Sequence, residues 1–277
     1  MLTIGRLNKL KIIRETEKEI VLDGEEEGQL VLPRREIPLD TEIGEEIEVF
    51  IYRNAQRKAV ATAIHPYVLA GEFDFLAVNE VSEAGVLLDW GISRDLFLPA
   101  REQKMRMRED GSYLVYVYYD LNSRQIIATA RVERFLGLKE PEYRMNQEVY
   151  LLIVKETELG YRVIVDNAHW GMIYQSEIFQ PIDCGLHLKG YVKQVRDDGK
   201  IDVSLQKQGY KVVDELGEKI LEALRRNGGY LAVNDKTDSE EISDFFGCSK
   251  KSFKKTIGTL YRQQAILITD DGIRLVD

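Results

Sequence analysis

A spacing of 66 residues recurs in the first half of the chain and limits what the chain can fold into. Leu32-Pro33 is repeated as Leu98-Pro99, and Phe50-Ile51-Tyr52 is repeated as Tyr116-Val117-Tyr118. A third copy lies about 75 residues beyond the second, with Tyr174 at the position of Pro99. A spacing that holds at separate landmarks indicates a structural repeat, so we expect several small units of one kind rather than one large domain.

Within each copy, apolar and polar residues alternate in short runs that end near Gly, Asn or Asp. Alternation with period two is typical of strands, and frequent turn residues favour antiparallel pairing. Five strands in about 65 residues is the size of an OB-fold, whose second and third strands face oligonucleotides. The third copy shows the pattern best, and its expected strands cover residues 149–154, 161–165, 170–174, 188–194 and 200–205.

The last segment changes to a helical period. A first helix is expected through the apolar positions 213, 216, 220, 221 and 224, and it ends at Asn227-Gly228-Gly229. A short helix begins with the capping residue Ser239 and closes at Gly247, and a longer helix covers residues 250–264. A hairpin with an Asp271-Gly272 turn follows. This order of elements predicts a winged helix-turn-helix.

Four short motifs in the third copy resemble the ribosomal S1 RNA-binding motif. The second copy matches that motif more loosely. The first copy matches least, because Glu19-Ile20-Val21 stands where a glycine and an aromatic residue are usual. The motifs of the third copy are Gly160–Val163, Trp170–Ile178, Gly190–Val192 and Gly199–Leu205.

Three S1-like repeats followed by a winged helix resemble the bacterial conserved virulence factor B (CvfB) family over essentially the whole chain. The resemblance implies an RNA-binding regulator of gene expression without catalytic activity, and single-stranded RNA is the expected partner. The implied fold class is mostly β with a C-terminal α+β domain: three tandem S1-like OB-fold barrels and a winged helix. The expected domains are a degenerate first barrel at residues 1–64, barrels at 65–138 and 139–210, and the winged helix at 211–277.

On an S1-type face, aromatic side chains stack under bases and basic side chains reach phosphates. In the third repeat, Tyr161, His169 and Tyr174 are the stacking candidates. Tyr174 takes the place of the family's usual histidine. Arg162 and Lys200 are the expected electrostatic partners. The alternative for either tyrosine is that it packs against the barrel and closes it.

In the second repeat, Trp90 aligns with a position where the family often has a stacking aromatic, and the alternative is a core role. Asp120 and Arg124 keep the family's spacing of an Asp and an Arg at the turn between the fourth and fifth strands, although such a pair can also serve solubility alone. A basic run in the same repeat offers contacts to the RNA backbone and consists of Arg101, Lys104, Arg106 and Arg108.

The expected recognition helix begins with a lysine cluster. Spacings of three and four place Lys251, Lys254 and Lys255 on the side opposite the apolar residues of this helix. Lys250 precedes them and Arg262 lies further along, so this helix is a candidate for nucleic-acid contact. The alternatives are a lysine face that serves solubility and a winged helix that binds protein. The pair Asp270-Asp271 in the hairpin would repel a phosphate backbone.

The net charge of −9 weighs against nucleic-acid binding, because phosphate neutralisation needs basic surface. Each expected domain carries more acidic than basic residues, so any phosphate contact must come from a local patch. This balance favours a rival function, a protein-interaction adaptor whose barrels have lost RNA binding. A second rival is a DNA-binding transcription regulator that uses the winged helix.

Catalytic and metal-binding patterns are absent from the sequence. The histidines at positions 65, 169 and 187 lack metal-ligand spacing, and no glycine loop of the phosphate-binding kind occurs. We therefore expect no enzyme activity, metal, cofactor or small-molecule substrate. Cys184 and Cys248 lie in different segments, and no run of about 18 apolar residues occurs, so the expected location is cytoplasmic without a membrane partner.

Overall fold

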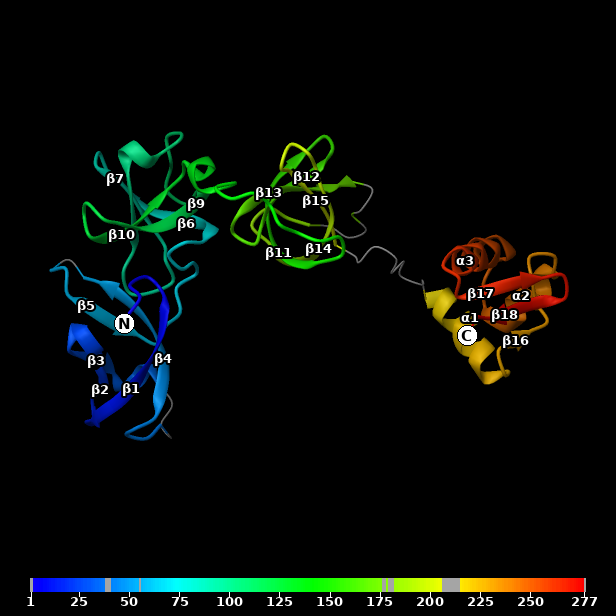
Figure 1. Cartoon of the computed structure of the whole chain (residues 1–277), viewed down its shortest axis with the longest axis horizontal. Helices are drawn as coiled ribbons and strands as arrows, with labels where there is room; N and C mark the ends of the chain where they lie inside the picture. The colour runs from blue at the N-terminus through cyan, green and yellow to red at the C-terminus, as the bar shows by residue number, and fades with distance from the viewer. Residues whose placement is uncertain are drawn as a thin grey trace. The chain divides into compact units, whose positions relative to one another are not determined.

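The computed structural model describes residues 2–37, 41–54, 56–175, 178, 182–205 and 215–276. The chain forms two compact units, Met1–Leu205 and Gln206–Asp277. The first unit consists of β-sheets, and the second combines helices with a small sheet (Figure 1). The mostly-β prediction with a helical C-terminal part is confirmed. None of the helices in the described ranges has the length and apolar character that a membrane span requires.

The first two sheets have five strands each and share one strand order. The first sheet has the order β3-β2-β1-β4-β5, and the second has the equivalent order β8-β7-β6-β9-β10. In both sheets the first strand of the repeat is central, because it pairs with its second and its fourth strand. The strands are β1 (Leu7–Glu15), β2 (Glu19–Asp23), β3 (Gln29–Pro33), β4 (Glu46–Arg53), β5 (Ala59–Thr62), β6 (Phe73–Val81), β7 (Gly85–Leu88), β8 (Leu96–Pro99), β9 (Ser112–Asp120) and β10 (Gln125–Thr129).

The third sheet closes into a barrel with the order β11-β12-β13-β15-β14. Closure depends on a parallel pairing of β13 with β15, in which Met172 lies opposite Asp202. Alternating residues of the strands fill the interior, among them Ile153, Val163 and Val203. The five expected strands are all present, as β11 (Glu148–Thr157), β12 (Gly160–Val165), β13 (His169–Tyr174), β14 (His187–Val195) and β15 (Ile201–Ser204).

A glycine begins the second strand of the second and third repeats because the backbone of the next strand passes too close for a side chain. A Cβ on Gly160 would lie 2.0 Å from the carbonyl oxygen of Ile173. A Cβ on Gly85 would lie 2.2 Å from the carbonyl oxygen of Leu98. Gly160 also has a φ of +138°, which disfavours any L side chain. The glycine of the repeat is therefore a packing requirement of the barrel.

The first and second barrels are joined by a shared apolar core. Trp90 is only 2% exposed and lies at the centre of this core. Its indole Nε1 donates a hydrogen bond to the carbonyl oxygen of Val68 at 2.8 Å. Its ring packs edge-on against Phe50 of β4 with a centroid distance of 5.2 Å. The stacking role expected for Trp90 is wrong, because a buried indole that joins two barrels has no face for a nucleic-acid base.

The second and third barrels meet through a smaller apolar cluster, which includes Phe73 of β6 and Ile164 of β12. The backbone N–H of Phe73 donates to the side chain of Asn167 at 3.0 Å. At the edge of the contact, His187 Nε2 lies 3.1 Å from Asp74 Oδ1. The hydrogen bond to Asp74 raises the pKa of His187 above its ordinary value, against the opposing effect of burial.

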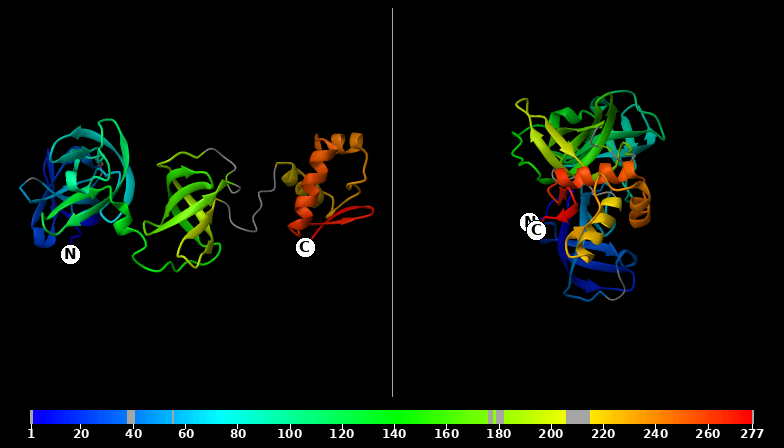
Figure 2. Two further views of the ribbon diagram at one scale, coloured as in Figure 1. Left: turned by 90° about the horizontal axis from the view of Figure 1, so that it is seen from above. Right: turned by 90° about the vertical axis from the view of Figure 1, so that its right-hand side faces the viewer.

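The second unit has the element order of a winged helix. The three strands have the order β16-β18-β17, and helix α3 packs on β17 (Figure 2). The capping residue of α2 is Asp238, whose side chain accepts from the N–H of Glu240, and not Ser239 as expected. Strand β16 was not expected from the sequence. The elements are α1 (Glu215–Arg226), β16 (Tyr230–Leu231), α2 (Ser239–Phe246), α3 (Lys250–Arg262), β17 (Ile266–Thr269) and β18 (Gly272–Leu275).

Replacing Gly160 by Ala should destabilise the third barrel more than replacing Gly199. Both glycines have positive φ, but a Cβ on Gly199 meets nothing within 4 Å. Alanine at a positive φ is destabilising by more than about 1 kcal/mol, and Gly160→Ala adds a collision with backbone. Urea unfolding followed by circular dichroism measures the difference. Equal losses in the two variants would contradict the close approach of β13.

The contact between the second and third barrels should weaken as the pH rises. Because the folded-state pKa of His187 is raised, its stabilisation is fully present below about pH 6.5 and is lost as the pH rises through the folded pKa. The effect should stay below about 1 kcal/mol, because the His187 side chain is 59% exposed. Urea midpoints between pH 5.5 and 8.5 should show this dependence in the wild type and lose it in His187→Gln. An unchanged pH profile in the variant would contradict the assignment.

Candidate nucleic-acid interface

The third barrel carries a groove of about 840 Å³ on its outer face. One side of the groove comes from β12 and β13, and the other side comes from the turn between β14 and β15. A segment that precedes the barrel forms the rim. The lining residues are Gly137, Leu138, Lys139, Glu140, Pro141, Leu159, Arg162, His169, Trp170, Gly171, Met172, Tyr174, Arg196, Asp198, Gly199, Lys200 and Asp202.

The alternation of strand β13 supplies the floor of this groove. Trp170, Met172 and Tyr174 are partly exposed, whereas the residues between them are buried. Arg162 pairs with Met172 across the β12–β13 ladder and is exposed. Its guanidinium carbon lies 3.6 Å from the centroid of the Trp170 ring. This distance is that of a cation–π stack, which holds the guanidinium flat against the indole.

Arg196 is fixed in the groove by a buried carboxylate. Its Nη2 and Nε lie 2.6 and 3.0 Å from the two oxygens of Asp202, so the pair is bidentate. Arg196 Nη2 also donates to the hydroxyl of Tyr174. Burial raises the pKa of Asp202, but hydrogen bonds from Arg196 and Gln194 outweigh burial and hold the pKa below its usual value. The network therefore keeps Tyr174 and Arg196 in one defined arrangement.

The groove is basic although the whole chain is acidic. Four basic and three acidic side chains line it, which leaves one net positive charge in a chain of net charge −9. Asp202 is used by Arg196, and Asp198 lies 2.7 Å from the ammonium of Lys200. Lys200 remains largely exposed, because its side chain keeps 65% of its accessible surface. A local basic site thus exists in a segment whose overall balance is acidic.

The structure brings together three of the residues expected in the third repeat, Arg162, Tyr174 and Lys200. His169 also borders the groove, but it is buried, and its two ring nitrogens contact the hydroxyl of Tyr143 and the carbonyl oxygen of Lys139. Tyr161 lies outside the groove and packs against the barrel core. Stacking by His169 is therefore wrong, because its ring is buried and held by its neighbours, whereas Tyr161 is partly exposed at the edge of the barrel core, outside the groove.

Three residues of the groove were missed by sequence reasoning. Trp170 and Met172 share the outward face of β13 with Tyr174, so the period of the strand could have identified them. Arg196 precedes Lys200 by four residues, which is the same spacing that drew attention to Asp120 and Arg124 in the second repeat.

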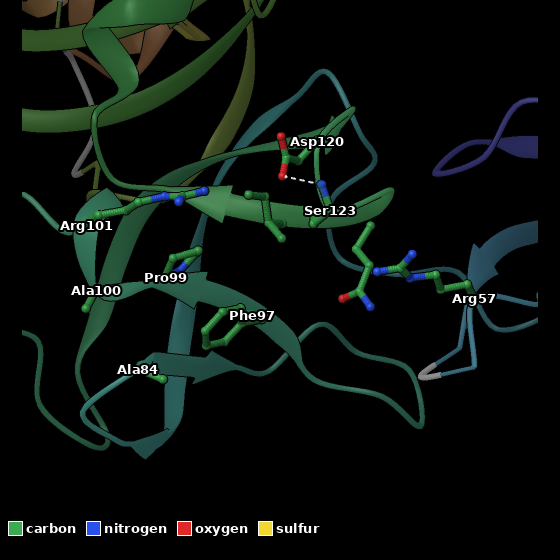
Figure 3. A pocket seen from close by; sticks show the side chains of 10 residues that line it. Arg57, Ala84, Phe97, Pro99, Ala100, Arg101, Asp120 and Ser123 are labelled. Carbon is green, nitrogen blue, oxygen red and sulfur yellow. Dashed lines mark hydrogen bonds between the residues drawn. The ribbon is translucent and has the colours of Figure 1, made fainter.

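Asp120 and Arg124 of the second repeat do not form the expected pair on a binding face. Asp120 is buried and stabilises its own turn, where its carboxylate accepts from the N–H group of Ser123 at 3.0 Å (Figure 3). It also accepts from the N–H group of Asn122 at 3.3 Å. Arg124 lies in the left-handed region with a φ of +57° and is exposed at that turn. These contacts make Asp120 a turn-capping residue.

The basic residues of the run in the second repeat do not share one surface site. Lys104 forms an ion pair with Glu133. Arg106 and Arg108 are exposed. Arg101 lines a separate groove of the second barrel.

Helix α3 presents its lysines to solvent. Lys251, Lys254 and Lys255 are exposed, whereas Phe253, Ile257 and Leu260 are buried, as the helical spacing predicted. Among the other basic residues of the helix, Lys250 is partly buried and Arg262 is exposed, with its Nε donating to the carbonyl oxygen of Gly258 at 3.0 Å.

Lys251, Lys254 and Lys255 form the lysine face of α3, and nearby carboxylates partly offset the positive charge of this region. The ammonium of Lys254 lies 3.7 Å from a carboxylate oxygen of Asp235. Near the wing, Asp270 lies 2.8 Å from the ammonium of Lys236.

Comparison with known proteins identifies domains at both ends of the chain. A model of the S1 domain matches residues 4–63, and a model of the CvfB-like winged helix domain matches residues 218–275. The S1 match falls on the repeat whose sequence motifs are weakest. S1 and winged-helix domains together indicate nucleic-acid binding.

Relatives match nearly the whole chain. The uncharacterized protein YitL of Bacillus subtilis is 30% identical over 87% of this chain and 82% of its own length. Conserved virulence factor B of Staphylococcus haemolyticus is 25% identical over 98% of this chain and 94% of its own length. A crystal structure of a multidomain protein with nucleic acid binding domains from Streptococcus pneumoniae is 21% identical, with a TM-score of 0.40 over 99% of this chain and 98% of that one. The first of these identities, together with the two domain models, shows that the chain belongs to the conserved virulence factor B family.

Proposed function

We propose that the protein binds single-stranded RNA in the groove of the third barrel, with the lysine face of α3 as a second contact. In this proposal it regulates gene expression in the cytoplasm without catalysing a reaction. The proposed domains are residues 1–64, 65–138, 139–210 and 211–277. The observation that carries the proposal is the groove itself, in which a guanidinium–indole stack, a tyrosine and two further cations share one surface.

The chemistry of the groove fits an unpaired strand better than a duplex. Bases of a single strand are free to stack on aromatic rings and on guanidinium planes, whereas those of a duplex already stack on each other. The outer face of Arg162 and the ring of Tyr174 are the two planar surfaces that we assign to bases. Arg196 and Lys200 stand at the opposite wall, where they are placed to contact phosphates.

The Arg196–Asp202 ion pair holds the Arg196 guanidinium in one orientation. Because both oxygens of Asp202 are engaged by Arg196, the guanidinium is oriented before a ligand arrives. A preorganised side chain loses less rotamer freedom on binding, which increases affinity. Phosphate contacts of this kind are independent of sequence, so we expect tolerance of different RNA sequences.

Two other functions retain support from particular surfaces. The exposed lysines of α3 also suit duplex DNA, because a winged helix places this helix in the major groove. Exposed apolar residues on the same unit favour a protein partner, since Phe245 is 59% exposed and Leu267 is 50% exposed. Gel shifts with single-stranded RNA, single-stranded DNA and duplex DNA separate the three possibilities.

Replacing Tyr174 by Ala should weaken RNA binding by about 1–3 kcal/mol, because one stacking surface is lost. Tyr150 gives a matched control, since it lies on β11 of the same barrel, is 67% exposed and lies outside the groove. Fluorescence anisotropy with a labelled oligouridylate measures both variants. Tyr150→Ala should bind as the wild type does. Equal affinities in the wild type and a folded Tyr174→Ala would remove the groove from the proposal.

The salt dependence of RNA binding tests the lysine face. Each phosphate neutralised on a single strand contributes about −0.7 to the slope of log K against log salt. Changing Lys251, Lys254 and Lys255 together to Gln should therefore flatten the slope by roughly 2. The control changes Lys9, Lys11 and Lys219 to Gln, which removes the same charge from exposed positions elsewhere. A slope that falls equally in both variants would assign the effect to net charge rather than to contact.

A further inference from the structure

The repeat places a groove at the same position on all three barrels. In each case the groove is lined by the residue before the second strand of the barrel and by the last residue of the third strand. These positions follow the spacings of 66 and 75 residues found in the sequence. They are Lys18, Ala84 and Leu159 for the first position, and Pro33, Pro99 and Tyr174 for the second.

The groove of the second barrel differs from the other two because two barrels build it. Nine of its ten lining residues belong to the second barrel, but Arg57 comes from the β4–β5 turn of the first barrel. Figure 3 shows Arg57 and Arg101 pointing into the groove from opposite sides, with the half-buried Phe97 on the adjoining strand β8. The groove has a volume of about 470 Å³.

The two arginines are available to a ligand. Arg57 is exposed, and its guanidinium forms no ion pair with any residue in the described ranges. The Arg101 side chain is 72% exposed, and the Glu102 carboxylate lies 4.0 Å from it.

The acidic groups near these arginines are already engaged. Glu102 is buried and accepts from Thr129 at 2.7 Å and from Arg134 at 3.2 Å. Asp120, the acidic residue of the groove lining, is held by its own turn. The groove lining therefore carries two cations, the carboxylate of Asp120 and a half-buried aromatic ring, which leaves one net positive charge.

We propose that this groove is a second subsite for single-stranded nucleic acid, a proposal that rests on the function assigned to the third barrel. Phe97 stacks on a base, and Arg57 and Arg101 contact the phosphates on either side of it. The aromatic role that the sequence assigned to Trp90 thus passes to Phe97, because Trp90 is buried between the barrels and Phe97 lies in the groove. The contact requires the first and second barrels together, since Arg57 belongs to the first.

The test is binding of a 5′-fluorescein-labelled oligouridylate of about 20 nucleotides to the full chain, as a function of salt. Arg57→Gln with Arg101→Gln should flatten the slope of log K against log salt by about 1.4, because two phosphate contacts are lost. Arg14→Gln with Arg144→Gln is the matched control: both arginines are exposed, and neither lines the groove or belongs to the basic run of the second repeat.

A second variant tests the stacking. Phe97→Leu keeps the apolar packing of β8 but removes the π-face, and should weaken binding on the order of tenfold. Ultraviolet crosslinking of the same oligouridylate, followed by peptide mass spectrometry, should yield a crosslink in the segment that contains Phe97.

The outcomes separate this proposal from the one on which it rests. If the arginine and Phe97 variants bind as the control does while Tyr174→Ala is impaired, the second subsite is wrong and the third-barrel function stands. Loss of affinity in all of these variants, but not in the control, supports both sites. Absence of wild-type binding at low salt overturns both.

Discussion

The parallel pairing of β13 with β15 is the interaction on which the third barrel and its groove depend. It closes the sheet, and it places Met172 directly opposite Asp202. The two walls of the groove come from segments about 25 residues apart, and without this pairing they would not face each other. Asp202 then fixes Arg196, which in turn contacts Tyr174. The β13–β15 pairing thus determines how Asp202, Arg196 and Tyr174 lie relative to one another.

Packing between the first and second barrels determines which residues line the groove of the second barrel. Trp90 and Phe50 belong to different barrels but share one core, so the two barrels cannot separate without exposing a large apolar surface. This fixed contact brings the turn that carries Arg57 to the edge of the second barrel. The third barrel is attached more lightly, through a smaller cluster and the His187–Asp74 pair, whose strength depends on pH.

Local arrangement, and not net charge, decides what an acidic chain like this one can bind. Several carboxylates near the grooves are already used: Asp202 by Arg196, Asp120 by its turn, and Glu102 by Thr129 and Arg134. Such acids contribute to the charge count while they hold cations and turns in place. Segment-by-segment counting therefore does not show how the charges are arranged on the surfaces formed after folding. Charge totals inform solubility and long-range steering, whereas contact depends on which charges remain free.

The sequence alone determined the repeat, the strands of the third barrel, the winged-helix order and the exposed lysines, because these follow from local periodicity and turn residues. Within the site it identified Arg162, Tyr174 and Lys200, which lie on outward positions of strands and turns. Tertiary structure decided the rest. Trp90 and His169 carry the right chemistry, but burial depends on what packs against a residue from elsewhere in the chain. Arg57 and Phe97 meet only because two separately encoded barrels share a core, a contact that no local pattern records.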